Sequence, residues 1–369
     1  MSRSLRGFVA GMFVLATAVP VTLALTISSA SALTTIAVTT MTDGGTGSLR
    51  AAFAAANAAD PDSVVIELQT GASYVLDDCK AGALDHDAGN PLTITGNGSK
   101  ITQTCTGKRV ITNVGSAGHL TVDHVWITGG NLPDGTAGGG IGATSSGLTI
   151  RYSTLSGNSA GSGGAVFVTG GGDVTVDNST IVGNTAIVDS GTGGVDAQGS
   201  AYLIYATIVG NTGASEGQAA NVSTGGDLIA FGSVIAEPLG TTANCSITGT
   251  PDSLGFNYSD DASCDLSATG DTENGADPQL GTLADNGGGT PTALPAASSP
   301  LVDHVAVAQC DFEGTLDDQR GVARPQGSSC DTGAVEVADP APPGSGEPAT
   351  PPAATQPATA LVAGPRFTG

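Results

Sequence analysis

Apolar and polar residues alternate in short runs through the middle of the chain. In LTVDHVWITGGN (120–131) and LTIRYSTLSGN (148–158), Leu, Val or Ile opens the run at every second position, which is the period of a β-strand. Three later copies of the phrase read VTVDNSTIVGN, YLIYATIVGN and LIAFGSVIAE. Glycine clusters separate the copies, as expected where a chain turns. The pattern predicts short β-strands joined by tight turns.

The copies return at a nearly constant spacing. Their last residues are 27, 26, 27 and 26 positions apart, at Asn131, Asn158, Asn184, Asn211 and Glu237. A strand rises about 3.3 Å per residue, so 26 residues are too many for one strand and suit a coil of two or three strands. Coils that stack on one another form a parallel β-helix. We therefore expect an all-β fold, a single-stranded right-handed parallel β-helix, with its repeats over residues 91–240.

The Gly-Asn step that closes four of the copies predicts a tight turn, because both residues tolerate a positive φ. If the coils stack in register, the four asparagines lie at one corner and form hydrogen bonds through their side-chain amides. We expect such an asparagine ladder at Asn131, Asn158, Asn184 and Asn211. Its role would be structural.

The segment before the repeats predicts a cap. Ser48 is a plausible N-cap for the helix LRAAFAAANAA, in which Leu49, Ala52, Phe53 and Ala56 share one face. The Asp60-Pro61 step ends this helix. An open end of a solenoid exposes apolar core and unpaired strand edges, so we expect residues 33–90 to form an N-terminal cap and the first strands.

The first 32 residues have the pattern of a secretory signal peptide. Arg3 and Arg6 precede a mostly apolar stretch, and Ala30-Ser31-Ala32 is a small-residue cleavage site, so cleavage is expected after Ala32. A membrane anchor is the alternative. No later segment has the roughly 20 apolar residues that a membrane span needs. We expect no transmembrane span after signal removal and an extracellular or cell-envelope location.

The charge balance excludes one class of partner. The chain has 11 Lys and Arg against 34 Asp and Glu, and loss of Arg3 and Arg6 with the signal changes the formal net charge from −23 to −25. Such a surface repels nucleic acid and anionic lipid. We expect no nucleic-acid partner.

Six cysteines follow the signal segment and allow fifteen pairings. Cys79 and Cys105 are 26 residues apart, which is one coil. Equivalent positions on adjacent coils lie about 4.8 Å apart, within disulfide range. This predicts a Cys79–Cys105 bridge and leaves Cys245–Cys264 and Cys310–Cys330 as the local pairings.

The repeat ends after residue 240. Residues 241–337 are rich in Gly, Asp and Pro and contain four of the six cysteines, which predicts an irregular, disulfide-containing C-terminal region. Residues 338–369 are rich in Pro, Ala and Thr and lack an apolar period. We expect this tail to be disordered.

Two flanking segments resemble a known family. VTTMTDGGTGSLRAAFAAANAADPDSVVIEL (38–68) resembles the head of secreted bacterial right-handed parallel β-helix repeat proteins. DPQLGTLADNGGGTPTALPAASSPLVDH (277–304) and DDQRGVARPQGSSCDTGAVE (317–336) closely resemble the choice-of-anchor Q domain that ends many of them. The resemblance implies a secreted or cell-surface bacterial protein. It implies no activity, because the family's biochemical role is generally unassigned.

The candidate catalytic residues are departures from the repeat. Arg151 aligns with Asp123 and Asp177 on the neighbouring coils, and His124 follows Asp123. Two coils separate the two carboxylates by about 9.6 Å, at the upper edge of the range for an inverting glycosidase, with Arg151 between them. The alternative for the column is a solvated ion-pair ladder.

Aromatic residues follow the same alignment. His124, Tyr152, Asn178, Tyr205 and Phe231 form one expected column, and Trp126 aligns with Thr154, Thr180, Thr207 and Ser233. Aromatic columns on a solenoid either stack sugar rings or fill space as packed side chains. The sequence leaves both open and favours packing.

Metal signals are weak. The chain has no CxxC and only four His, which disfavours zinc. The acidic cluster Asp77-Asp78 and Asp85-His86-Asp87 is the other candidate for a catalytic carboxyl pair, and a turn or a Ca²⁺ contact is its alternative. The single nonapeptide-like GTGGVDAQG also leaves Ca²⁺ binding open. We identify no other cofactor.

Right-handed β-helices of the pectate-lyase-like kind host lyases, glycosidases, adhesins and autotransporter passengers, so the fold does not choose an activity. Because basic and aromatic residues are sparse in the repeats, we expect a non-catalytic surface protein that contacts an extracellular polysaccharide or another envelope component. The alternative is a polysaccharide lyase or glycoside hydrolase. Whether the protein is an enzyme stays open at this point.

Overall fold

The computed structural model describes residues 33–59, 62–114, 118–215, 218–240, 243–312 and 314–338. The predicted signal peptide and the tail beyond residue 338 lie outside the described residues, as does the Asp60-Pro61 step. None of the helices in the described ranges is long and apolar enough to cross a membrane.

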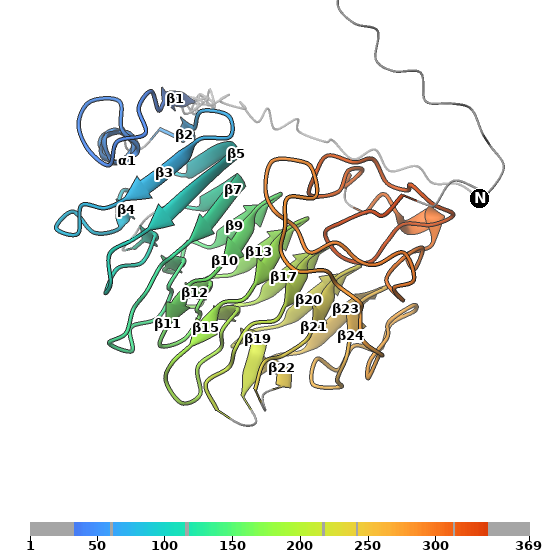
Figure 1. Cartoon of the computed structure of the whole chain (residues 1–369). Coiled ribbons are helices and arrows are strands. Elements are labelled where there is room, and N and C mark those ends of the chain that lie inside the picture. The colour runs from blue at the N-terminus through green and yellow to red at the C-terminus, as the bar shows by residue number, and fades with distance from the viewer. Residues whose placement is uncertain are drawn as a thin grey trace, which may run out of the picture.

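The protein is a parallel β-solenoid whose strands form three lateral faces, as Figure 1 shows for the stack from β5 to β23. The first face holds β1 (Thr34–Ala37), β2 (Val64–Glu67), the start of β5 (Leu92–Gln103) and of β7 (Leu120–Thr128), β9 (Leu148–Arg151), β13 (Val174–Asp177), β17 (Ala201–Ile204), β20 (Leu228–Phe231) and β23 (Pro251–Gly255). The second face holds β3 (Ser73–Leu76), the ends of β5 and β7, β10 (Thr154–Ser156), β14 (Thr180–Val182), β18 (Thr207–Val209), β21 (Val234–Ala236) and β24 (Tyr258–Ser259). The third face holds β4 (Leu84–His86), β6 (Ile111–Asn113), β8 (Ile141–Ala143), β12 (Val166–Val168), β16 (Val195–Ala197), β19 (Ala219–Thr224) and β22 (Ala243–Ile247).

Every one of these strands pairs in parallel with the equivalent strand of the next coil. The short strands β11 (Ser159–Ala160) and β15 (Thr185–Ala186) form a separate parallel pair. Stacked strands run from Thr34 to Ser259, so coil formation extends to both sides of the segment in which the repeat is visible in the sequence.

Aliphatic side chains stack in the interior because each strand turns every second residue inward. One such column is Leu92, Leu120, Leu148, Val174, Ala201 and Leu228, all of them 0% exposed. Full burial of one Val, Leu or Ile side chain contributes about 1.5–3 kcal/mol. The alternation that predicted the strands therefore also places the apolar side chains that form the core.

The predicted cap is confirmed. Helix α1 (Leu49–Ala58) begins after Ser48, whose hydroxyl accepts a hydrogen bond from the amide of Ala51 at 3.2 Å. The helix buries the expected face, Leu49, Ala52, Phe53 and Ala56, in the same core cluster as the first strands. It covers the apolar end of the solenoid.

The predicted asparagine ladder is present, but one of the four asparagines assigned to it does not belong to it. Asn158 Nδ2 donates to Asn184 Oδ1 at 3.0 Å, and Asn184 Nδ2 donates to Asn211 Oδ1 at 3.0 Å. The chain of amides then continues through Asn221 to Asn244, which the repeat did not predict. Asn131 was wrongly included: it is exposed, and the amide of Gly130 binds Asn158 instead. Trp126 pairs with Thr154, and from this pair to the closing asparagine the first copy has one residue more than the second.

The last copy also differs from the sequence alignment by one residue. Phe231 pairs with Ile204 and not with Tyr205, and Val234 rather than Ser233 pairs with Thr207. The corner between the first two faces needs a left-handed residue, and Gly232 (φ 55°) takes the place that Tyr205 (φ 48°) has one coil earlier.

Three disulfides have the expected partners. Cys79–Cys105 joins neighbouring coils with a Cα–Cα distance of 5.3 Å, as the one-period spacing predicted. Cys245–Cys264 and Cys310–Cys330 join nearby segments toward the C-terminal end. The first bridge ties the capped end of the solenoid to the coils that follow.

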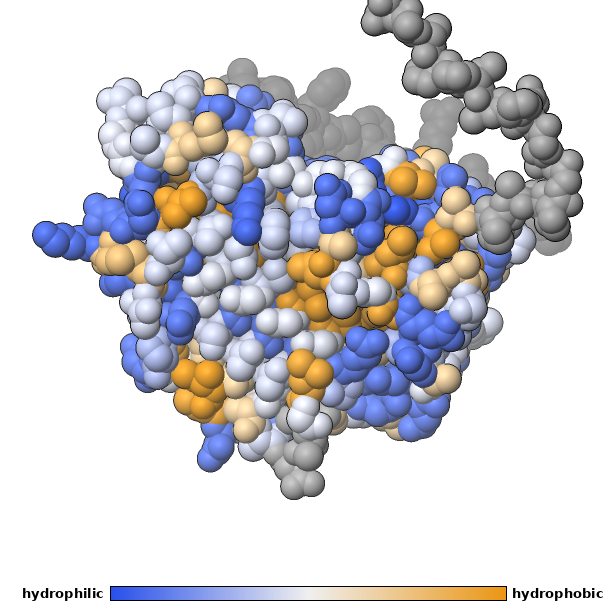
Figure 2. Space-filling model, in the orientation of Figure 1, coloured by the Kyte–Doolittle hydropathy of each residue, from blue (hydrophilic) through white to orange (hydrophobic). Residues whose placement is uncertain are grey.

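The C-terminal region, residues 260–338, is mostly irregular, with one short 3-10 helix η1 (Val307–Gln309). It lies against the second face, where Leu280 and Leu301 pack on the outward side chains Val209 and Val234. Figure 2 shows hydrophobic residues gathered near the centre of the view, where the C-terminal loops of Figure 1 meet β20 and β21. This region therefore covers the later coils and leaves the earlier part of the second face open.

Candidate functional site

The predicted Asp-Arg-Asp column forms on the first face. Asp123 pairs with Arg151, and Arg151 with Asp177, in successive coils. Arg151 Nη2 lies 3.0 Å from Asp123 Oδ2, with 45% of the arginine side chain exposed and 13% of the aspartate side chain. Asp177 Oδ1 accepts a hydrogen bond from Asn178 Nδ2 at 3.1 Å. Arg151 thus stands between the two carboxylates, where an attacking water and a sugar would have to lie.

His124 joins this cluster at the corner between the first two faces. Its Nδ1 lies 2.6 Å from Asp123 Oδ1, and its ring stacks on Tyr152 with centroids 4.8 Å apart. Burial raises the pKa of Asp123, but the hydrogen bond from His124 and the charge of Arg151 outweigh it, so this pKa lies below its ordinary value. Asp123 is therefore ionised at neutral pH, and the proton of the short contact belongs to Nδ1. The Asp123-His124-Arg151 cluster is one unit.

The expected aromatic column divides into two parts. His124 and Tyr152 stay partly exposed, whereas Tyr205 and Phe231 are buried at 0% and 1% exposure. Phe231 stacks on Phe312 at 4.0 Å, and the Tyr205 hydroxyl donates to the carbonyl of Cys310 at 3.0 Å. Packing is the use of the later aromatics, as the sequence favoured, and their partners come from the C-terminal region.

Trp126 is in an open position on the second face. It pairs in register with Lys100 on the preceding coil and with Thr154 on the next one. The Lys100 ammonium lies 3.7 Å from the centroid of the indole ring, and the indole N–H donates to Ser156 Oγ at 2.8 Å. These contacts fix the ring on both neighbouring coils.

A cleft of about 350 Å³ lies beside this ring, and we call it the Trp126 cleft. Its other walls come from one C-terminal loop: Leu283, Ala284, Asp285, Gly288, Gly289, Thr290 and Pro291. The loop is held by hydrogen bonds from Thr154 Oγ1 to the carbonyl of Pro291 (2.6 Å) and from Thr290 Oγ1 to the carbonyl of Tyr152 (3.1 Å). Sequence reasoning selected Trp126 and missed the cleft, because no pattern links the loop to the repeat.

The cleft and the Asp123-His124-Arg151 cluster are neighbours. The position of a Cβ at Gly289 is 4.0 Å from His124 Cδ2, so His124 lies at the edge of the loop. On the other side, a side chain at Gly98 (φ 81°) would come within 2.8 Å of the carbonyl oxygen of Gly289. Glycine at 98 therefore permits the loop to approach the solenoid corner.

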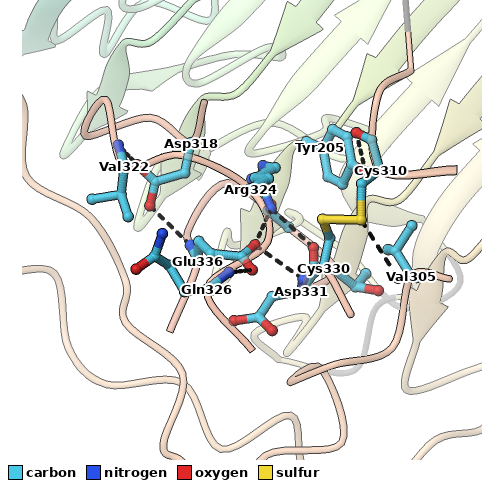
Figure 3. Close-up of polar contacts among 12 residues, drawn as sticks. Tyr205, Val305, Cys310, Asp318, Val322, Arg324, Gln326, Cys330, Asp331 and Glu336 are labelled. Carbon is cyan, nitrogen blue, oxygen red and sulfur yellow. Dashed lines mark hydrogen bonds and ion pairs between the residues drawn. A yellow bond between two sulfur atoms is a disulfide. The ribbon is translucent and has the colours of Figure 1, made fainter. Parts of the chain in front are cut away.

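A buried ionic network, shown in Figure 3, anchors the C-terminal region and was also missed. Arg324 Nη1 contacts Glu336 Oε2 at 2.9 Å, and Arg324 Nη2 donates to Asn178 Oδ1 of the solenoid at 3.2 Å. The guanidinium also lies 4.1 Å from the ring centroid of Tyr205. Next to it, burial raises the pKa of Asp331 to about 7. Arg324, Asp331 and Glu336 share the segment 317–336, but no sequence spacing indicates that Arg324 pairs with Glu336 or reaches Asn178.

No group of three or more His, Cys, Asp or Glu that could hold a metal ion occurs within the described ranges. Asp78 Oδ1 accepts the amides of Lys80 and Ala81, which is a turn contact. His86 is buried between Asn113 (2.7 Å) and Asn90 (3.3 Å). In GTGGVDAQG, Asp196 accepts a hydrogen bond from Ser162. Calcium binding stays a prediction.

Comparison of the chain with protein-family models, with curated proteins and with solved structures finds no match.

Proposed function

We propose that the protein is a secreted or cell-envelope-associated, non-catalytic protein that binds an extracellular glycan in the Trp126 cleft. The observation that carries this proposal is the half-buried indole of Trp126 beside a 350 Å³ cleft. An apolar cleft with a few polar groups is the usual form of a small-ligand site. Here Leu283 and Pro291 are apolar walls, and Asp285 and Thr290 are polar ones.

A glycan fits this chemistry better than other ligands. The faces of sugar rings carry C–H groups that pack on an aromatic ring, while their hydroxyls need donors and acceptors. The charge of −23 on the whole chain opposes nucleic acid. Trp126 belongs to a lateral face built from stacked coils, and such an extended face suits a polymer.

The extracellular location has two supports. Three disulfides, with no free cysteine among the described residues, are typical of an oxidising compartment. The resemblance of residues 277–304 and 317–336 to the choice-of-anchor Q domain favours a bacterial surface protein.

The test is calorimetric titration of a panel of neutral and acidic oligosaccharides into the protein and into Trp126→Ala. We expect binding that falls at least about tenfold, or about 1.4 kcal/mol, in the variant. The matched control is Tyr202→Ala, an exposed aromatic on the first face that does not line the cleft. Equal binding by Trp126→Ala would place the glycan elsewhere.

A second candidate function, glycan cleavage, is favoured by one observation. His124 lies beside the loop that lines the Trp126 cleft, with Nδ1 2.6 Å from Asp123 Oδ1, and an imidazole held by a carboxylate is a common arrangement in general acid–base catalysis. Burial raises the pKa of the stacked Tyr152, which keeps its phenol protonated as a donor. Incubation with the same glycans, followed by detection of new reducing ends, tests it. Product that is lost in His124→Ala would establish the enzyme and overturn the non-catalytic proposal.

A further inference from the structure

We propose that two copies of the chain associate through the N-terminal end of the solenoid, with their β1 strands paired antiparallel around a two-fold axis. This inference is independent of the proposed function. It is carried by the unpaired outer edge of β1, by an exposed alanine face on α1 and by the lack of net charge in residues 33–59.

The outer edge of β1 is available for a further strand. Among the described residues, β1 pairs with β2 alone. The amides of Thr34 and Val38 donate to carbonyls of the next coil, both at 2.9 Å. Alternate residues of a parallel strand bond the same neighbour. The N–H and C=O groups of Thr35 and Ala37 therefore point away from β2, toward the end of the solenoid.

The sequence of this edge lacks the features that usually prevent strand pairing. Exposed edge strands commonly carry a lysine, a proline or a bulge. Residues 33–42, LTTIAVTTMT, contain no charged residue and no proline. Leu33 is 68% exposed and Met41 is 51% exposed. Because uncharged segments rich in β-branched residues pair well with copies of themselves, a second β1 suits this edge.

Helix α1 adds an apolar surface at the same end. Its inner face packs in the core cluster with the first strands. The opposite face consists of alanines, Ala51, Ala54, Ala55 and Ala58. The last three of these are exposed. A helix that is apolar on all sides is normally buried on all sides, so a second copy placed on this end would give α1 its missing cover.

The distribution of charge favours this end for contact between copies. Residues 33–59 contain two charged residues, Asp43 and Arg50, and these form an ion pair at 2.6 Å. The formal charge of −25 expected after signal removal therefore lies entirely outside this segment. Repulsion between like charges opposes association through acidic surfaces, whereas the neutral end meets its copy without that cost.

The opposite end of the solenoid is closed, which limits the association to two copies. The amide of Asn244 in β22 donates to Asp261 Oδ2 at 2.9 Å. The amide of Cys245 donates to Ser263 Oγ, also at 2.9 Å. Side chains of the C-terminal region thus occupy the edge that head-to-tail stacking would need. Contact between two equal N-terminal ends is isologous and gives a closed dimer, in which the two β1 strands run antiparallel.

The test is the mass of the protein in solution. Sedimentation equilibrium of the secreted protein over a concentration series is expected to show reversible association from one copy to two. We expect slower hydrogen exchange at the amides of Thr35 and Ala37 above the dissociation constant than below it. A single copy at every concentration would overturn the inference, and so would assembly that continues beyond two copies.

Two variants assign the contact to β1. Thr35→Pro removes an outward N–H without removing a bond to β2, and Ala37→Lys places two like charges at the contact. Each is expected to weaken dimer formation at least about tenfold, with the thermal unfolding of the single copy little changed. Leu254→Lys is the control, because it replaces an exposed apolar residue of β23 at the opposite end. A dimer that both β1 variants leave unchanged, or that Leu254→Lys weakens equally, would contradict the assignment to β1.

Discussion

Arg324 Nη1 lies 2.9 Å from Glu336 Oε2, and neither side chain has exposed surface. The same guanidinium reaches Asn178 on the solenoid, so the pair connects the C-terminal region to the corner of the repeats. Because an unpaired charge is costly in a buried site, the two residues depend on each other. The loop that completes the Trp126 cleft belongs to the region that this pair holds in place.

Removing one member of the pair is expected to loosen the C-terminal region. Glu336→Gln leaves the Arg324 charge buried without its counter-ion, which costs about 3–5 kcal/mol in unfolding free energy. Urea unfolding followed by the fluorescence of Trp126 measures it, because the indole lines the cleft that the C-terminal loop completes. Asp252→Asn, at an exposed position, is the control. A loss below about 1 kcal/mol would contradict a structural role for the pair.

The pKa of Asp331 gives a pH dependence of known sign. Burial raises this pKa from its ordinary value of 3.8 to about 7, so between these values the folded state holds a proton that the unfolded state releases. The contribution of Asp331 to stability is therefore full below about pH 4 and declines as pH rises through 7. We expect the stability of the protein relative to Asp331→Asn to fall between pH 5 and 7. A difference that is constant across this range in urea titrations would contradict the pKa shift.

The asparagine ladder predicts a contrast between two residues that look alike in the sequence. Asn184→Ala removes the acceptor for the amide of Asn158 and the donor to the carbonyl of Leu155, both buried. Each unsatisfied buried group costs about 1–3 kcal/mol. Asn131→Ala, at an exposed position outside the ladder, is expected to change stability by less than about 0.5 kcal/mol. Equal losses in thermal unfolding would show that the register is wrong.

The disulfide between coils predicts a local loss. Replacing Cys79 and Cys105 together by Ser is expected to reduce the unfolding free energy by about 2–4 kcal/mol, because the bridge restricts the unfolded chain. In this double variant, we expect faster hydrogen exchange at the backbone amides of β3 and of the coils that the bridge joins. Mass mapping of non-reduced peptides provides the direct check, and another partner for Cys79 would contradict the coil register.

The repeat made the regular parts of the structure predictable. The prediction was less accurate where the copies of the repeat differ in length by one residue. Period-two alternation predicted the strands, and the one-coil spacing predicted the Cys79–Cys105 bridge. Asn131 and Phe231 were each aligned one residue away from their true positions, because the first and last copies differ in length from the others. Each corner of the coil accepts any residue that tolerates a positive φ, so the residue type does not fix the alignment. Sequence spacing alone does not show which copy contains the additional residue.

The site was only half predictable for a different reason. Asp123, His124 and Arg151 were found together, as the alignment of coils indicated. The second wall of the Trp126 cleft comes from residues 283–291, which have no repeat to align and reach the solenoid through contacts such as that of Thr154 with Pro291. The Arg324–Glu336 pair was missed because it depends on the same irregular packing.

The most direct test of glycan binding uses the tryptophan itself. Trp126 is the only tryptophan in the chain, so its fluorescence reports on the cleft alone. Titration with the panel of neutral and acidic oligosaccharides is predicted to give, for the ligands that bind, a saturable change in the intensity or emission wavelength of this fluorescence. An unchanged spectrum at ligand concentrations that saturate binding by calorimetry would contradict the account, because it would place the glycan away from Trp126.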